Sequence, residues 1–327
     1  MSQTIRPAQP EPAEVAESAE QFAPVGRGIE LCYQTYGDPS DEPLLLVMGL
    51  GGPMTWWDPE LCRQLALAGF YVVRFDNRDV GRSTKLERTE RSRVTFPKLA
   101  KAFVGLRVTP PYTLADMADD VVGLLDHLGL DSTHLFGISM GGMIVQTMAI
   151  NHPDRVRSVV SMMSTTGKRT VGFQHPSLIP TLLARKVGRD AYVEGSVKIW
   201  RMIGSPGFPA TEAEVRRRAE DTYERGVSGA AVARQMLAVI TQPDRTRDLR
   251  RVTAPMTVIH GLADKMVHVS GGRATSMAVP GSELLLIDGM GHDLPPALWP
   301  TYVAAVRRTA DRACLTPHQA SGETPVE

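Results

Sequence analysis

The segment Gly137-Ile138-Ser139-Met140-Gly141 constrains this chain most, because it places a serine between two glycines where a predicted strand meets a predicted helix. The apolar run 133–138 predicts the strand, and the run 142–151 predicts the helix. At such a turn the serine hydroxyl is exposed, and the flanking glycines leave room for the backbone bend. The first N–H groups of the helix point toward whatever lies above the serine. This context predicts that Ser139 is a nucleophile rather than an ordinary turn or helix-cap residue.

Strands and helices alternate on both sides of this turn. Strands are predicted over 28–36, 43–48, 70–75, 133–138, 156–163, 256–260 and 283–287, and helices over 59–68, 113–130, 142–151, 270–277 and 298–312. Alternation of this kind predicts an α/β fold with a mostly parallel central sheet and helices on both faces. Ligands of such sheets bind outside the carboxyl ends of the strands, where Ser139 and the loop 49–52 are both expected.

The alternation stops between residues 167 and 250, where helical runs occur over 178–186, 192–202, 212–225 and 230–240. We therefore expect a helical cap at 167–250, inserted into a core formed by 23–166 and 251–314. Within the cap, Arg216-Arg217-Arg218 is interpreted as a solvated helix face. Residues 1–22, rich in Pro, Ala and Glu, are expected to form a disordered lead, and 315–327 a flexible tail.

Composition excludes several kinds of partner. The 327 residues are 43% hydrophobic, enough for a large core, and the 36 basic residues balance the 36 acidic ones. We therefore expect no nucleic-acid partner and no stable membrane insertion, and a small, uncharged substrate. The three cysteines, far apart and odd in number, are interpreted as reduced packing residues of a cytoplasmic protein without metal or disulfide. A homodimer is the oligomeric state that we consider for this chain.

Among the eight histidines, His292 is the candidate base for the serine. It stands in Gly289-Met290-Gly291-His292-Asp293, directly after the last predicted strand, where the glycines allow a loop to carry it over the sheet. His127, His134 and His152 lie in or beside elements below this edge of the sheet. Surface or core roles are expected for those three.

The acid that orients the histidine is expected after the preceding strand, in His260-Gly261-Leu262-Ala263-Asp264. A carboxylate there accepts from the imidazole Nδ1–H and stabilises the imidazolium that forms during the reaction. Asp264 is favoured over Asp288, which fits a brace for the histidine loop. It is also favoured over Asp293, because a residue adjacent to the histidine cannot easily fold back onto its ring.

Two backbone N–H groups are expected to stabilise the oxyanion of the tetrahedral intermediate. One belongs to Met140, next to the nucleophile, and the other to Leu50, in the loop after the second predicted strand. Side chains near the strand ends are candidates for an apolar substrate pocket: Trp56, Trp57, Met162, Met163 and Met266. The methionines could equally be core residues.

These motifs resemble the α/β-hydrolase fold superfamily over residues 28–312. The resemblance is carried by Gly137–Gly142, by His260–Asp264 and by Gly291-His292, which follow one another in the order serine, acid, histidine. Most relatives have His-Gly in the oxyanion loop, whereas this chain has Met48-Gly49. That form, with the polar segment Phe75–Ser83, is similar to the subgroup of aclacinomycin methylesterase and many bacterial carboxylesterases.

The resemblance implies a helical cap, a serine nucleophile, and hydrolysis of carboxylic esters through an acyl-enzyme with no cofactor and no metal. It also implies that Asp76–Ser83 is a hydrogen-bonded brace beneath the site. We therefore expect a serine esterase for small to medium apolar esters, methyl esters among them. Substrate specificity does not follow from the fold.

Other functions remain open. A carbon–carbon bond hydrolase or a cofactor-free perhydrolase would use the same triad, although the former usually shows His-Gly-x-Gly-Pro where this chain has Met48–Gly52. Haloalkane dehalogenases and epoxide hydrolases use an aspartate nucleophile, so Ser139 argues against them, and Met140 disfavours a proline iminopeptidase. The non-enzyme alternative is a ligand receptor that has kept the fold.

Overall fold

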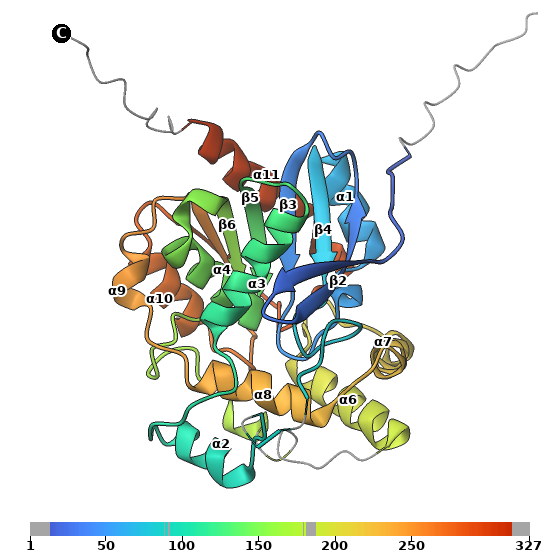
Figure 1. The fold of residues 1–327 in the computed structure, drawn as a ribbon, viewed down its shortest axis with the longest axis vertical. Helices are drawn as coiled ribbons and strands as arrows, with labels where there is room; N and C mark the ends of the chain where they lie inside the picture. The colour runs from blue at the N-terminus through green and yellow to red at the C-terminus, as the bar shows by residue number, and fades with distance from the viewer. Residues whose placement is uncertain (1–13, 88, 91, 179, 181–187, 316–327) are drawn as a thin grey trace, which may run out of the picture.

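The computed structural model describes residues 14–87, 89–90, 92–178, 180 and 188–315. Its centre is an eight-stranded sheet in the order β1-β2-β4-β3-β5-β6-β7-β8 (Figure 1). The strands are β1 (Gln21–Gly26), β2 (Ile29–Tyr36), β3 (Glu42–Val47), β4 (Phe70–Phe75), β5 (Thr133–Ile138), β6 (Val156–Met162), β7 (Met256–Gly261) and β8 (Glu283–Ile287). Pairing is parallel from β4 to β8 and antiparallel for β1 and β2. The predicted fold class is confirmed.

The described helices connect and cover these strands. They are α1 (Pro59–Leu67), α2 (Phe96–Phe103), α3 (Leu114–His127), α4 (Met140–Asn151), α6 (Arg189–Ile203), α7 (Glu212–Glu224), α8 (Gly229–Ile240), α9 (Thr246–Leu249), α10 (Ser270–Ala278) and α11 (Trp299–Leu315). Short 3₁₀ turns are η1 (Met54–Trp56), η2 (Pro153–Arg155), η3 (Pro176–Leu178) and η4 (Pro296–Leu298). Thr113 caps α3 through reciprocal hydrogen bonds with Asp116.

Two apolar cores lie on opposite faces of the sheet, because successive side chains of a strand point in opposite directions. In β3, Leu45 packs with α3 and α4, whereas Leu44 and Leu46 pack with α1 and α11. Both faces of β3 and β5 are buried, which explains their nearly unbroken apolar sequence. This sandwich holds the carboxyl ends of β5, β7 and β8 in fixed positions.

The expected disordered lead 1–22 needs correction over the part that the structure describes. Residues 14–20 lie along β2, and β1 starts at Gln21 and pairs with that strand. Glu17 forms an ion pair with Arg63, and Glu20 forms ion pairs with Arg82 and Arg225. The glutamates that made this segment resemble a disordered one therefore fix it to the fold. Residues 1–13 lie outside the described residues, as does the tail from 316 onward.

The cap helices α6, α7 and α8 lie between β6 and β7 in the chain and together on one side of the sheet (Figure 1). Helix α2, which periodicity did not predict, lies on the same side. The predicted helix 178–186 falls almost entirely outside the described residues. The boundaries assigned to the cap, 167 and 250, stay a prediction.

Among the described residues, no helix is long and apolar enough to cross a membrane. The same part of the chain contains no group of three or more metal-binding side chains. The three cysteines are free thiols; Cys32 and Cys62 are buried as expected for packing residues, whereas Cys314 is exposed. Burial raises the pKa of the Cys62 thiol to about 12, so this thiol is protonated at neutral pH.

Candidate active site

The turn that carries the predicted nucleophile Ser139 lies between β5 and α4 and has the bent geometry that its sequence predicts. Ser139 has φ 57° and ψ −117°, and its N–H donates to the carbonyl of Met162 at 2.9 Å. A side chain on Gly141 would overlap the carbonyl of Val47, and one on Gly137 would overlap Gly141. Backbone strain of this kind costs about 1–3 kcal/mol and persists only where the surroundings enforce it. The two glycines thus allow the bend that exposes the Ser139 hydroxyl.

The structure brings the predicted serine, histidine and aspartate into one hydrogen-bonded chain. The Nε2 atom of His292 lies 3.1 Å from the Oγ of Ser139, and its Nδ1 lies 2.7 Å from the Oδ2 of Asp264. The competing carboxylates do not contact this ring: Asp288 is exposed, and Asp293 bonds to Ser205. The arrangement lets the imidazole accept the serine proton while the carboxylate holds its other nitrogen.

Asp264 is held ionised by its surroundings. Its Oδ1 accepts from the N–H groups of Met266 at 2.8 Å and Val267 at 2.9 Å. Burial alone would raise the pKa of this carboxyl, but the charge of His292 and the hydrogen bonds from His260 and His292 outweigh it, so the pKa is lowered. A permanently charged carboxylate can stabilise an imidazolium beside it.

His260 is a neighbour of the triad that sequence reasoning missed. It is fully buried, its Nε2 lies 2.8 Å from the carbonyl of Val267, and the same atom lies 3.5 Å from Asp264. With the proton on Nε2, this ring donates to the loop that holds Asp264. The signal was present, because His260 and Asp264 belong to the same quoted motif, four positions apart.

The two expected oxyanion donors lie at the same cavity as Ser139. Leu50 and Met140 both line it, and no acceptor for either N–H is found among the described residues. A Cβ on Gly49 would come within 3.2 Å of the Ser139 Cβ, so the loop passes close to the nucleophile. Asn77 fixes this loop by donating to the carbonyl of Met48 at 3.0 Å. The free N–H groups can receive a developing negative charge.

The segment that the resemblance marks as a brace is buried beneath this loop. Asp76 accepts from the N–H groups of Met54 at 2.7 Å and Arg82 at 2.8 Å. The Ser83 hydroxyl donates to the carbonyl of Asp76 at 2.6 Å and accepts from Cys32. The segment also reaches the cavity, because Asp79, Val80 and Gly81 line it.

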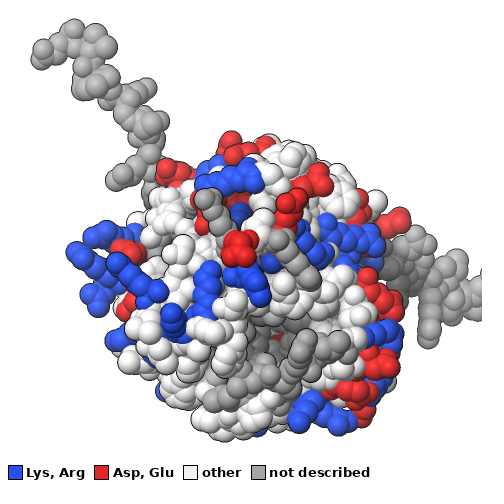
Figure 2. All heavy atoms as spheres, turned by 60° about the horizontal axis from the view of Figure 1, so that its bottom comes forward, with Lys and Arg blue, Asp and Glu red and all other residues white. Residues whose placement is uncertain are grey.

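The cavity over Ser139 has a volume of about 690 Å³ and mostly apolar walls. Of the predicted pocket residues, Trp56, Met163 and Met266 line it. Figure 2, a view of the molecule turned toward the cap side, shows a hollow that adjoins uncharged residues, with both signs of charge farther out. A volume of this size suits a small or medium organic molecule.

The prediction that Trp57 and Met162 line the pocket is wrong. Trp57 is fully buried in the core, where its ring lies 4.9 Å from that of Phe136. It directly follows the short turn η1, and of the two tryptophans only Trp56 lines the cavity. Met162 and Met163 are both buried in the same apolar core, but only Met163, which follows β6 with φ 50°, also lines the cavity.

The cap supplies a wall that sequence reasoning did not predict. Its lining residues come from α6, α7 and α8 and the loop between the last two: Tyr192, Ser196, Ile199, Trp200, Ile203, Arg218, Thr222, Val227, Val232 and Met236. The interpretation of Arg216-Arg217-Arg218 as a solvated face is wrong for Arg218, which is half-buried against Trp200. Because α7 turns about 100° per residue, consecutive arginines cannot share one face.

The loop of His292 is fastened to the cap. The N–H of His292 donates to the carbonyl of Ile203 at 2.7 Å, at the end of α6. The Ser205 hydroxyl accepts from the N–H of Gly291 at 2.8 Å and donates to Asp293. Asp293, rejected as the catalytic acid, thus holds a cap residue. The position of the base depends on these contacts.

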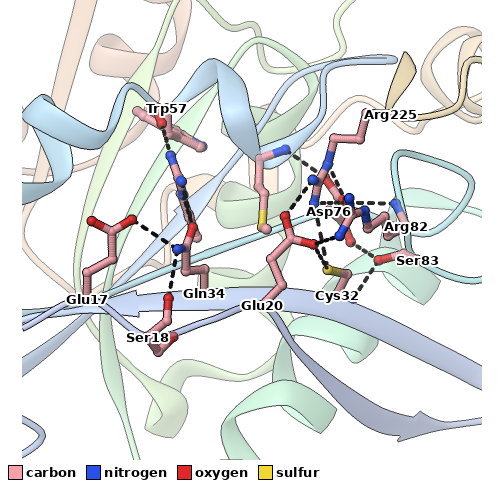
Figure 3. A network of polar contacts seen from close by, with 12 residues as sticks. Glu17, Ser18, Glu20, Cys32, Gln34, Trp57, Asp76, Arg82, Ser83 and Arg225 are labelled. Atoms are coloured by element: carbon pink, nitrogen blue, oxygen red, sulfur yellow. Dashed lines mark hydrogen bonds and ion pairs between the residues drawn. The ribbon is translucent and has the colours of Figure 1, made fainter. Parts of the chain in front are cut away.

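Ion pairs form a second set of contacts between the cap and the rest of the protein. Arg225, directly after α7, bonds to the buried Asp76 at 2.8 Å and to Glu20 at 2.6 Å (Figure 3). On α8, Arg234 pairs with the buried Asp79 at 2.7 Å. The cap therefore forms ion pairs with carboxylates of the Asp76–Ser83 segment and of the N-terminal segment.

Comparison with known proteins agrees with this architecture. A family model described as "alpha/beta hydrolase fold" matches residues 42–295. Rhodomycin D methylesterase DauP of Streptomyces sp. (strain C5) is 29% identical over 302 residues, covering 85% of this chain and 94% of that protein. A putative carbamate hydrolase RutD of Caulobacter sp. (strain K31) is 27% identical, covering 84% and 94%. The structure of esterase RhEst1 from Rhodococcus sp. ECU1013 has a TM-score of 0.67 at 20% identity, covering 90% and 99%.

Proposed function

The chain belongs to the α/β-hydrolase fold family, and we propose that it is a serine hydrolase that cleaves carboxylic esters through an acyl-enzyme. The observation that carries the proposal is the unbroken chain of hydrogen bonds from Ser139 through His292 to Asp264, with Ser139 and His292 lining the cavity. A serine hydroxyl is a weak nucleophile without a neighbouring base, and this arrangement supplies one. The similarity to a protein named as a methylesterase supports esters as the substrates.

In the first step, the Oγ of Ser139 attacks the ester carbonyl while Nε2 of His292 takes its proton. The negative oxygen of the tetrahedral intermediate is stabilised by the N–H groups of Leu50 and Met140. His292 then gives the proton to the leaving alcohol, and the acyl group stays on Ser139. The ionised Asp264 stabilises the imidazolium between these transfers.

In the second step, water enters the space that the alcohol has left. His292 takes a proton from the water as its oxygen attacks the acyl carbonyl, and the same two N–H groups stabilise the second oxyanion. Collapse of this intermediate breaks the bond to Ser139, which regains a proton from His292. The acid product leaves, and no redox partner or cofactor takes part in these steps.

The cavity walls support a substrate whose body is apolar. Met163 and Met266 lie beside the triad, and Trp56 and Trp200 stand edge to face with their ring centres 5.3 Å apart. Flexible methionine side chains adapt to ligands of irregular shape. We propose small to medium esters as substrates, methyl esters included.

Covalent labelling tests the proposal. A fluorophosphonate should modify Ser139, identified by mapping of the labelled peptide, and p-nitrophenyl butyrate should give a burst followed by steady turnover. Ser139→Ala should remove both signals, with a loss of at least about a thousandfold in kcat. Ser132→Ala, at the opposite end of β5, is the matched control and should keep both. A folded wild-type protein with neither labelling nor turnover would be a receptor rather than an enzyme.

A further inference from the structure

One arginine of the cap faces the substrate cavity. Arg218, on α7, lines the cavity together with Trp200 and with the catalytic His292. Its guanidinium carbon lies 4.1 Å from the centre of the Trp200 ring, which stacks edge to face on Trp56. Stacking on an aromatic face holds a guanidinium in place while leaving its edge N–H groups free for a ligand.

This guanidinium is not paired within the protein as described. Among the described residues, no hydrogen bond or ion pair reaches the guanidinium of Arg218, and its Nε is buried without an acceptor. The carbonyl of Arg218 accepts from the Thr222 hydroxyl, but this bond does not involve the charged group. The cap stretch that the structure does not describe, 179 and 181–187, contains neither Asp nor Glu. On the same helix, Arg216 forms ion pairs with Glu194 and Glu212 at the surface. The guanidinium of Arg218, at the cavity, has no such carboxylate partner among the described residues.

The carboxylates nearest to Arg218 are occupied. Asp293 acts on it at longer range, but the two Asp293 oxygens bond to the hydroxyl and the N–H of Ser205. Glu214 closes the N-terminal cap of α7 with Thr211. Asp79, which also lines the cavity, is paired with Arg234.

Burial therefore acts on Arg218 with little compensation. Loss of hydration lowers the pKa of its guanidinium, against the weaker opposing charges of Asp293 and Glu214. A partly buried cation without a bonded partner is costly to the free protein. A bound group with negative oxygen atoms would remove that cost, and carboxylates match the planar N–H pattern of arginine.

We propose that Arg218 binds a carboxylate at the end of the substrate remote from the scissile ester. The substrates would then be acidic esters with an apolar middle, such as half-esters of dicarboxylic acids. The apolar middle lies along the methionine and tryptophan walls, with one end at Ser139 and the other at Arg218. This inference rests on the proposed ester hydrolysis and replaces the uncharged substrate expected from net charge.

Paired substrates test the role of the charge. One series contains monomethyl esters of dicarboxylic acids from succinate to suberate, and a second contains acetate esters of ω-hydroxy acids. Each acid is compared with its primary amide, which has nearly the same shape and keeps a carbonyl acceptor but no charge. At the best chain length, the wild-type kcat/KM should be about tenfold or more higher for the acid, as expected for a charged hydrogen bond.

Variants then assign the preference to one residue. Arg218→Gln should reduce the acid-to-amide ratio to about one, and Arg218→Lys should keep part of it, because lysine retains the charge but not the fork. Arg217→Gln, exposed on the same helix, is the control and should keep the wild-type ratio. The rate of fluorophosphonate labelling at Ser139 reports that each variant is folded.

The outcomes distinguish a failure of the carboxylate site from a failure of the proposed ester hydrolysis. An absence of acid preference in both series, or a preference that Arg218→Gln retains, would overturn the carboxylate site while ester hydrolysis stood. Failure of every ester together with failure of Ser139 labelling would instead refute the proposed hydrolase.

Discussion

The sheet and the cap are held by different forces. The sheet lies between two apolar cores, and β3 and β5 contribute buried side chains to both of them. The cap is joined to the core by apolar residues of α8 and, in addition, by specific polar contacts of Arg225, Arg234 and Ser205. Apolar packing depends on area and little on orientation, whereas hydrogen bonds and ion pairs require particular partners.

The difference has a consequence for the site, because the polar contacts of the cap end on loops that carry the proposed catalytic groups. The cap bonds to the His292 loop through Ile203 and Ser205. It bonds to the oxyanion loop through Gln235, whose side-chain oxygen accepts from the N–H of Gly51 at 2.8 Å. Sheet packing should therefore determine whether the protein folds, and cap contacts should determine how well the loops are positioned.

The largest predicted effect is a loss of catalysis that leaves the apolar packing of the sheet and the polar contacts of the cap in place. His292→Ala should lower kcat by about 10³- to 10⁴-fold, because the serine loses its base, and should leave unfolding by urea nearly unchanged. Its backbone bond to Ile203 does not depend on the imidazole. His268→Ala, an exposed histidine in the neighbouring loop after β7, is the control and should retain full activity. A variant of His292 with a tenth of wild-type kcat would rule it out as the base.

The next effect tests the charged attachment of the cap. Arg225→Met leaves Asp76 buried without its cation, which should reduce the free energy of unfolding by about 3–5 kcal/mol. Hydrogen exchange should increase more in α7 than in β3, because the apolar cores remain. Arg216→Met, which removes an exposed ion pair of α7, should cost at most about 1 kcal/mol. Equal losses from the two variants would mean that the cap is held by packing after all.

The parts held by apolar packing were the parts that the sequence predicted. The predicted strands 70–75, 133–138 and 283–287 have the observed bounds. Strands β4 and β5 are buried and have the apolar runs that this requires, whereas β8 is a half-buried edge strand that keeps the apolar run 284–287. The proposed triad was predicted from position as well as from residue types. Ser139, Asp264 and His292 each follow a strand, and the carboxyl ends of parallel strands share one edge.

The parts that the sequence did not predict depend on orientation across long separations. Arg218 and Arg216 belong to one charge run, yet one faces the cavity and the other the solvent. Helical spacing places Arg218 on the face of the buried Val215 and Thr222. That this face borders a cavity depends on Trp200, which comes from a different helix. The N-terminal segment was misread for a similar reason, since Glu20 finds its partner Arg225 more than two hundred positions later.

A third prediction probes the sheet through pH. His134, in β5, is buried and its Nδ1 bonds to Ser158 at 2.8 Å. Burial is the main cause that lowers its pKa to about 4, with Arg157 and Arg307 adding to it and Glu42 opposing. The unfolded chain, with a histidine pKa near 6.5, binds the proton first as pH falls. The stability present above pH 6.5 is therefore lost between pH 6.5 and about 4.

The size of this loss follows from linkage. Between pH 6.5 and pH 5 it amounts to about 2 kcal/mol, at ~1.36 kcal/mol per pH unit. His134→Asn keeps a polar atom for Ser158 but cannot take up the proton, so its unfolding free energy should fall by about 2 kcal/mol less over this range. Urea unfolding at pH 7 and pH 5 measures both proteins. Parallel losses in the two would show that His134 is not the acid-sensitive group of the sheet.

The smallest predicted effect tests whether the cap positions the base. Ser205→Ala removes the hydroxyl that joins Gly291 and Asp293, so the loop of His292 should sample orientations in which Nε2 does not meet Ser139. We expect kcat to fall about tenfold, the typical cost of one hydrogen bond, with KM and the site of fluorophosphonate labelling unchanged. Thr211→Ala is the matched control, because it removes a cap hydroxyl that only starts α7. It should lower stability by about 1 kcal/mol and leave kcat as it is. An equal loss of kcat in both variants would mean that cap stability, rather than the contact at Gly291, governs the base.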